Sequence, residues 1–346
     1  MKDQLMARIE AIQKEIQFSG SIFVENREAV LADASYGYAN RAEQLDNQAG
    51  TRYGIASGCK IFTAVAICQL VEEGKLAFDT SLQQCLDVEF PNFNERITIH
   101  HLLTHTSGVP DYFDEEVMDV FEELWIEQPM YHIRRLQDFL PLFQHGHMKF
   151  VPGERFHYNN AGFILLGLIV EKVSGLVFTD YVQTQIFQKA GMMDSGYFAL
   201  DALPAKTALG YIECEDGTWK TNIYSLPVQG GSDGGAFVTA KDMVKFWEAL
   251  LGHELLSEAS TSRLLTPYVQ NGDGDFYGYG VWIQKRDETV FKYHVMGYDP
   301  GVSFHSALYP ASAIKLAVCA NASSGAFGVM KAIEDELIKS KSLEVF

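Results

Sequence analysis

The sequence places a serine and a lysine one helical turn apart, where an apolar segment begins. Ser57 and Lys60 stand three residues apart in Ser57-Gly-Cys-Lys60. On a helix this spacing puts both side chains on one face, with about 5–6 Å between their Cβ atoms. A lysine buried beside a serine at a positive helix end can lose its proton and accept the hydroxyl proton. Ser312 and Lys315 repeat the spacing at a turn into a strand, where the side chains point apart, and we interpret that match as chance.

Two further groups of residues are suited to the same chemistry. Tyr158 and Asn160 stand two residues apart on a predicted turn before a helix. A phenol can move a proton for Lys60, and an amide can hold a substrate carbonyl. The segment His294-Val-Met-Gly297-Tyr-Asp-Pro-Gly301 ends a predicted strand, where a sheet edge offers backbone N–H groups. The three groups together offer a nucleophile, groups that can transfer its proton and groups that can hold a carbonyl.

In this order, Ser57-x-x-Lys60, Tyr158-x-Asn160 and a strand-end glycine motif resemble the serine β-lactamase and penicillin-binding protein superfamily. The chain is most similar to the class C-like branch, which includes penicillin-binding DD-peptidases, esterases and D-amino-acid peptidases. Three further segments support the resemblance: Tyr53-Gly-Ile-Ala-Ser57, residues 97–108 and Gly230-Gly-Ser-Asp-Gly-Gly235. The resemblance runs from about Ser21 to Ile338, nearly the whole chain.

The resemblance implies an α/β (α+β) fold of the β-lactamase/transpeptidase type. Residues 1–52 and 230–346 would form an antiparallel sheet flanked by the N- and C-terminal helices. Residues 53–229 would form a mostly helical subdomain inserted between them. The active site would lie in the cleft between the two parts, which together make one catalytic unit.

The resemblance also implies a role for each matching residue. Ser57 would be the acylated nucleophile, and Lys60 and Tyr158 would share the proton transfers. Asn160 would bind the substrate amide. The oxyanion hole would consist of the backbone N–H groups of Ser57 and Tyr298.

The third motif departs from the family pattern, which usually reads Lys-Thr-Gly or His-x-Gly. Anchoring on Gly297 places Val295 and Met296 where the cation and the hydroxyl should be. Anchoring on His294 keeps a histidine but inserts one residue before the glycine, which requires a β-bulge. We favour the Gly297 register and expect Gly297 and His294 to be the substrate-binding candidates of this strand. In either register the group that grips a substrate carboxylate is missing or displaced, which weakens the case for β-lactamase or D-Ala-D-Ala carboxypeptidase activity.

Hydrophobic patterns predict the elements that must position these residues. Helical spacing of apolar residues predicts helices at both ends of the chain and over 60–73, 161–173 and 239–251. Residues rich in β-formers predict strands over 21–25, 28–32, 279–284, 290–295, 302–309 and 315–320. Strands at both ends of a chain must join one sheet, because neither half buries its face alone. The aromatic and acidic segment 111–143 has no clear period.

Composition excludes several other classes of protein. The 346 residues carry a formal net charge of -18, which repels nucleic acids and anionic membranes. No apolar run reaches the length of a membrane span. The five cysteines form no C-x-x-C pair and indicate free thiols in a reducing compartment. The N-terminus lacks a signal peptide's apolar core, so we expect a cytoplasmic protein if the chain is complete, and a cell-surface one if a leader was removed.

The sequence also bears on a zinc site, on a different hydrolase fold and on a protein that binds without hydrolysis. His100, His101 and His105 invite a zinc interpretation, but no Glu stands between them as H-E-x-x-H requires, so we expect structural histidines and no metal. We expect no cofactor either. The absence of a G-x-S-x-G elbow argues against an α/β-hydrolase. A non-hydrolysing penicillin- or peptide-binding protein of the same fold is the second hypothesis. The expected partner is a small-molecule or peptide substrate, with β-lactams among the candidates.

Overall fold

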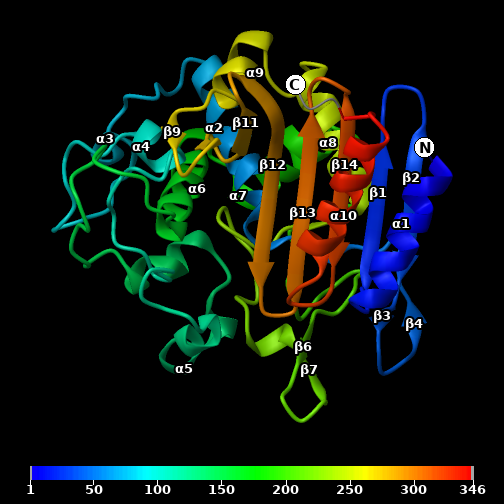
Figure 1. Ribbon diagram of the computed structural model, residues 1–346. Helices are drawn as coiled ribbons and strands as arrows, with labels where there is room; N and C mark the ends of the chain where they lie inside the picture. The colour runs from blue at the N-terminus through cyan, green and yellow to red at the C-terminus, as the bar shows by residue number, and fades with distance from the viewer. Residues whose placement is uncertain (1, 344–346) are drawn as a thin grey trace.

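The computed structural model describes residues 2–343, and its centre is an eight-stranded antiparallel sheet (Figure 1). The strand order is β2-β1-β14-β13-β12-β11-β10-β9, so the two ends of the chain meet where β1 pairs with β14. The strands are β1 Gly20–Glu25, β2 Val30–Tyr36, β9 Val269–Gln270, β10 Asp275–Tyr277, β11 Trp282–Arg286, β12 Thr289–Asp299, β13 Val302–Tyr309 and β14 Ile314–Ala320.

Helices cover both faces of this sheet. The terminal helices α1 (Lys2–Glu15) and α10 (Ala326–Lys339) pack together on one face, seen in front in Figure 1, and α8 (Ala240–Leu251) packs on the other. Side chains alternate between two cores along β14: Leu316 and Val318 join the core under α1 and α10, whereas Ala317 and Cys319 join the larger core under α8. This period of two is the expected pattern for a strand buried on both faces.

The segment between β2 and α8 contains most of the remaining helices. They are α2 Lys60–Glu72, α3 Leu82–Cys85, α4 Ile99–Leu103, α5 Leu124–Glu127, α6 Asn160–Ser174 and α7 Phe178–Val182, with α9 Glu258–Leu264 following α8. Three two-stranded ribbons accompany them: β3 Tyr38–Asn40 with β4 Leu45–Asp46, β5 Tyr53–Gly54 with β8 Phe237–Val238, and β6 Tyr211–Glu213 with β7 Trp219–Thr221. Helix α2 is buried almost all round, as expected for a core helix. It therefore provides a rigid support for the residues at its N-terminus.

The predicted fold class is confirmed: an antiparallel sheet with helices on both faces and a helical insertion. The strand predicted over 302–309 is β13, and the predicted helices over 60–73 and 161–173 correspond to α2 and α6. The short strands β9 and β10 were not predicted, because two or three residues are too few for a period to emerge. Among the described helices, none by itself is both long and apolar enough to span a membrane; α6 and the helix after it pass the length and composition test only as a pair bent by 77°.

Candidate active site

A strained turn presents Ser57 at the start of α2. The residues Ala56–Cys59 form a short 3-10 helix that runs directly into α2 at Lys60. Ala56 has φ of 46°, a left-handed conformation that costs a non-glycine residue about 1–3 kcal/mol. Strain of this kind is retained where the surrounding structure holds a functional side chain in place. Here it lies one residue before the predicted nucleophile.

Lys60 contacts Ser57 and two fixed acceptors. Its Nζ atom lies 2.9 Å from Ser57 Oγ, 2.9 Å from Asn160 Oδ1 and 2.7 Å from the backbone oxygen of Asp233. The residue is only 2% exposed. The amide and backbone oxygens are fixed acceptors that hold the Lys60 amine beside the Ser57 hydroxyl.

Tyr158 completes this cluster from the opposite wall. Its hydroxyl is hydrogen-bonded to Ser57, and Lys60 Nζ lies 4.9 Å from the centre of its ring. Burial raises the pKa of the Tyr158 phenol well above its ordinary value, and the Ser57 hydrogen bond offsets this only in part. The phenol therefore stays protonated at neutral pH and is suited to donating a proton. Trp282, which the sequence analysis did not single out, stacks on its ring at 6.3 Å.

His105 holds the loop that carries Tyr158 and Asn160. Its backbone oxygen accepts the N–H of His157 at 2.8 Å, and its Nδ1 accepts the N–H of Asn159 at 3.1 Å. Its Nε2 lies 3.2 Å from the hydroxyl of Tyr277. Burial lowers the pKa of His105 well below its ordinary value, so the ring is neutral and can accept at Nδ1. This histidine positions the loop.

Asp111 orients Asn160 and was missed by the sequence analysis. Its carboxylate accepts the backbone N–H groups of Asn160 at 2.7 Å and Ala161 at 2.9 Å, at the N-terminus of α6. Burial raises the pKa of Asp111 to about 7, against the lowering effect of these hydrogen bonds. The position lies in the aromatic, acidic segment without periodicity, so no sequence signal marked it. Its contacts fix the amide that faces Lys60.

Gly297 brings β12 against the backbone of the nucleophile turn. A Cβ atom on Gly297 would lie 2.1 Å from Ile55 O, 2.7 Å from Gly58 N and 2.8 Å from Ser57 N, so only glycine fits. The pairing of β12 with β13 runs without a register shift from Tyr293 to Asp299. The bulge that the alternative His294 register required is therefore absent from this segment, and Gly297 is the glycine at the site.

His294 is placed away from the cleft, whereas the site residues predicted from the first two motifs converge there. Along β12, which pairs with β13 without a register shift over this stretch, His294 and Gly297 are three residues apart, so their side-chain positions lie on opposite faces of the sheet. Its ring packs on Trp282 at 6.5 Å, and its buried Nδ1 has no hydrogen-bond partner among the described residues. Burial lowers its pKa well below the ordinary histidine value. The structure thus places His294 on the face of β12 opposite to the one that abuts Ser57 and gives no support to its predicted contact with a substrate.

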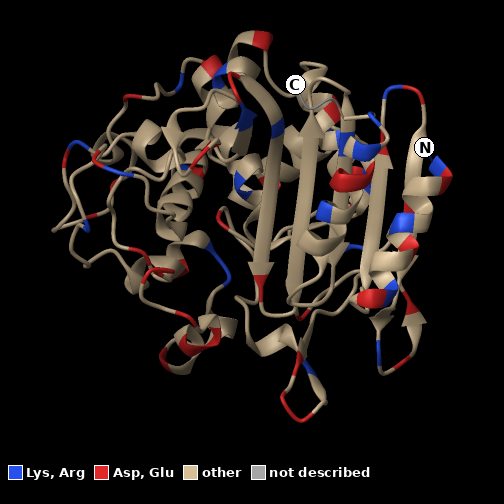
Figure 2. Ribbon diagram, viewed as in Figure 1, with Lys and Arg blue, Asp and Glu red and all other residues tan. Residues whose placement is uncertain are grey.

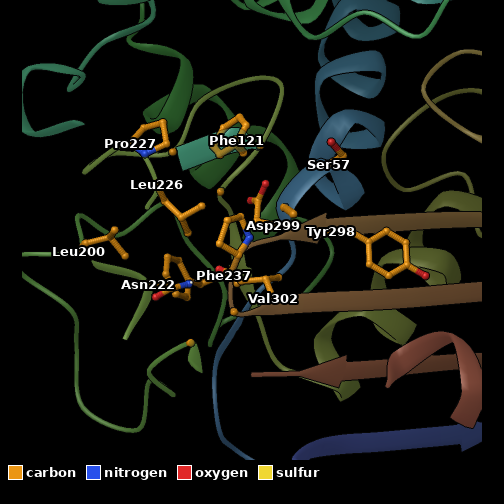
Figure 3. Close-up of a pocket in the computed structure, with 18 of the residues that line it drawn as sticks. Ser57, Phe121, Leu200, Asn222, Leu226, Pro227, Phe237, Tyr298, Asp299 and Val302 are labelled. Carbon is orange, nitrogen blue, oxygen red and sulfur yellow. Dashed lines mark hydrogen bonds between the residues drawn. The ribbon is translucent and has the colours of Figure 1, made fainter. Parts of the chain in front are cut away.

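Tyr298 lines the cleft with its backbone while its side chain points away. Figure 3 shows its ring directed away from the other labelled residues, and its hydroxyl is hydrogen-bonded to His305. Because Gly297 abuts Ser57 N, the peptide that follows it lies beside the nucleophile. Ser57 and Tyr298 both line the cleft, as an oxyanion hole made from their N–H groups requires.

The cleft itself is apolar on one wall and acidic near Ser57 (Figure 3). It encloses about 1130 Å³, open solvent included. Its apolar wall includes Phe113, Phe121, Phe139, Leu200, Leu226 and Phe237. Its charged residues, none of them singled out from the sequence, are Glu115, Asp233 and Asp299. Burial raises the pKa of all three carboxyls, that of Asp299 to about 7.

The three histidines weighed as zinc ligands have separate partners. His100 Nδ1 lies 2.9 Å from the hydroxyl of Tyr279, and His101 Nδ1 lies 3.0 Å from Thr98 Oγ1 within a helix cap. Within the described residues the one group with metal-ligand spacing is a different set, Asp114, Glu116 and His157. The ammonium group of Lys149 contacts all three of those side chains. That set is therefore already bound to a cation of the protein itself.

The second serine–lysine pair forms no comparable site. Lys315 Nζ is bound by Glu25 at 2.9 Å and by Glu248 at 2.7 Å. Both partners are carboxylates on neighbouring elements, so Lys315 is held as a charged structural residue. Ser312 lies in the turn before β14.

A model of the beta-lactamase family matches residues 7–337 of this sequence. The chain belongs to the beta-lactamase family. Among curated proteins, penicillin-binding protein 4* of Bacillus subtilis (strain 168) is 30% identical over an alignment of 304 residues that covers 83% of this chain and 64% of that protein. The chain therefore spans less than two thirds of the length of this relative.

Solved structures agree with the family. A penicillin-binding protein from Bacillus halodurans is 64% identical, with a TM-score of 0.92 over 94% of this chain and 99% of the other. A D-amino acid amidase from Ochrobactrum anthropi SV3, solved in complex with L-phenylalanine amide, has a TM-score of 0.79 over 97% of this chain and 99% of its own. At 20% identity the second comparison shows a shared fold alone. The predicted superfamily is confirmed.

Proposed function

We propose that this protein is a serine hydrolase that forms an acyl-enzyme on Ser57 and cleaves a small amide, ester or D-amino-acid peptide. The observation that carries the proposal is the 2.9 Å contact between Lys60 Nζ and Ser57 Oγ at a cleft wall. Burial of Lys60 and its two fixed acceptors supply the setting in which a lysine serves as a base.

In the proposed acylation step, Ser57 Oγ attacks the substrate carbonyl carbon while its proton passes to Lys60 Nζ. The carbonyl oxygen becomes an oxyanion that accepts the N–H groups of Ser57 and Tyr298. One such donor is worth about 100- to 1000-fold in rate. The carbon–nitrogen or carbon–oxygen bond then breaks, and the leaving group takes a proton from the Tyr158 phenol, which recovers one from Lys60. A water molecule attacks the acyl-enzyme by the same route in reverse and regenerates Ser57.

The cleft favours substrates without a carboxylate next to the scissile bond. Val295 stands two residues before Gly297, where the family motif usually has a cation, and apart from Lys60 beside Ser57 the described residues that line the cleft include no Lys, Arg or His. A charge-assisted hydrogen bond to a carboxylate is worth about 10- to 150-fold in affinity. That factor should be lost for penicillins and D-Ala-D-Ala peptides and retained for neutral esters.

Two measurements test the proposal. The protein is incubated with a neutral nitrophenyl ester, a chromogenic cephalosporin and a covalent serine inhibitor, and intact mass and peptide mapping follow. We expect ester turnover faster than cephalosporin turnover and an adduct on the peptide containing Ser57, both absent from the Ser57→Ala variant. An adduct elsewhere would overturn the assignment of the nucleophile. A stable acyl adduct without turnover would favour the non-hydrolysing binding protein.

A further inference from the structure

The carboxylate of Asp299 lies unpaired in the wall of the cleft. Asp299 is the last residue of β12, the acidic position at the tip of that strand in Figure 2. Within residues 2–343 its side chain makes no hydrogen bond and no ion pair, although the carboxylates of Asp233 and Asp111, which also lie near Lys60, are both hydrogen-bonded. Asp299 is half-buried, and withdrawing an unpaired charge from water is costly unless a partner binds it.

Asp299 faces the same side of β12 as the nucleophile. Side chains two residues apart on a strand share one face and are separated by roughly 7 Å, so Asp299 and Gly297 point the same way. A Cβ atom on Gly297 would lie 2.8 Å from Ser57 N, so this face of the strand abuts the nucleophile turn. Figure 3 places the Asp299 side chain on the pocket side of the strand, opposite to the Tyr298 ring.

The leaving group and the acyl group of a substrate would lie in opposite directions along β12. Tyr158, the proposed proton donor to the leaving group, packs on Trp282, which pairs with His294 near the middle of β12. The leaving group therefore lies toward His294. The acyl group lies toward the opposite end, where Asp299 stands beside the apolar wall.

We propose that Asp299 binds an ammonium group on the acyl part of the substrate, so that the enzyme prefers amides, esters or peptides of amino acids with a free amino group. This inference rests on the proposed function. An α-ammonium group is one carbon away from the scissile carbonyl, and Asp299 directly follows Tyr298, whose N–H would bind the carbonyl oxygen. The apolar wall then receives the amino-acid side chain.

The charges around Asp299 agree with a cationic ligand. Glu115 and Asp233 lie near it and are both acidic. The positive charge of Lys60 also acts on Asp299, but that side chain already contacts Ser57, Asn160 and the backbone oxygen of Asp233. Burial and the two neighbouring carboxylates raise the pKa of Asp299 to about 7, and an ammonium group bound there would lower it.

The test uses two substrates that differ only in the amino group: phenylalanine p-nitroanilide, as each enantiomer, and its des-amino twin, 3-phenylpropionyl p-nitroanilide. We expect the full chain to prefer one enantiomer of the amino substrate over the twin. Asp299→Asn should lower kcat/KM for that enantiomer by about 10- to 150-fold and change that of the twin less than about threefold. Glu288→Gln removes the same charge from the exposed turn at the other end of β12 and should change neither value.

A binding measurement separates this inference from the proposed function. Calorimetry with phenylalanine amide on Ser57→Ala, with and without Asp299→Asn, should show binding that weakens by about 10-fold or more in the double variant. Equal losses on both anilides, equal binding by both variants or a preference for the des-amino twin would overturn the role of Asp299. If the wild-type protein binds phenylalanine amide through Asp299 but hydrolyses no ester or anilide, the proposed hydrolase fails and the ammonium site stands.

Discussion

Replacing Gly297 by alanine should separate β12 from the turn that carries Ser57. The new Cβ would lie 2.1 Å from Ile55 O and 2.8 Å from Ser57 N. Ordinary carbon–oxygen contacts lie at about 3.3–3.6 Å, so the strand or the turn must move by about 1 Å. Neither neighbour is a flexible side chain that could rotate away. The added methyl group should therefore change both the stability and the geometry of the oxyanion hole.

The expected magnitudes follow from these two effects. Overpacking of this kind lowers the free energy of unfolding by about 1–3 kcal/mol. A displacement of about 1 Å between reacting groups costs on the order of 100-fold in rate, and loss of one oxyanion donor costs about 100- to 1000-fold. The Gly297→Ala variant should thus remain folded while kcat for a neutral nitrophenyl ester falls by at least 100-fold.

The assay compares thermal unfolding and ester kinetics for the wild type, Gly297→Ala and Gly50→Ala. Gly50 is a suitable control because a Cβ there would meet no atom within 4 Å. We expect the control to behave as the wild type in both measurements. Wild-type kcat with an unchanged melting temperature in Gly297→Ala would refute the argument that this glycine sets the distance between β12 and Ser57.

Four further predictions test other parts of the site. Lys60→Arg should lower the rate of acylation by several orders of magnitude, because guanidinium stays protonated; near wild-type stopped-flow rates would contradict the role of Lys60 as base. Tyr158→Phe should lower kcat/KM for an anilide by roughly 100- to 10,000-fold but affect a nitrophenyl ester much less, since nitrophenolate leaves without a proton, and equal losses would exclude proton donation. Burial raises the pKa of Asp299 from 3.8 to about 7, so the contribution of its protonated form to stability is fully present below about pH 4 and is lost as the pH rises through 7. Asp299→Asn should therefore raise the free energy of unfolding at about pH 8 by on the order of 1–3 kcal/mol relative to its effect near pH 4. Denaturation of both proteins at the two pH values checks this, and an equal effect at both would contradict it. Activity should survive treatment with EDTA, and a loss that zinc restores would indicate a metal hydrolase instead.

The local pattern of the sequence was sufficient for the elements whose residues are contiguous. The helix predicted over 60–73 is α2, because an apolar run that ends at Gly74 specifies a buried helix without reference to distant contacts. The proximity of Ser57 and Lys60 could be predicted for the same reason, since a helical turn fixes the distance between residues three apart. Segment 111–143 could not be read, because its short 3-10 and α-helical turns follow from packing against α6 and the cleft.

The amino-acid sequence alone thus determined the superfamily, the fold class and the identity of the residues around Ser57. Tertiary structure decided between the two registers of the third motif, because β12 pairs with β13 without a bulge from Tyr293 to Asp299 while Gly297 abuts Ser57, so Val295 and not His294 stands two residues before the glycine on the same face. It also revealed Asp111 and Asp299, whose effects on Asn160 and on the cleft depend on contacts between segments far apart in the chain. Spacing within one element can be read from sequence, whereas burial and unpaired charge arise only when separate elements pack together.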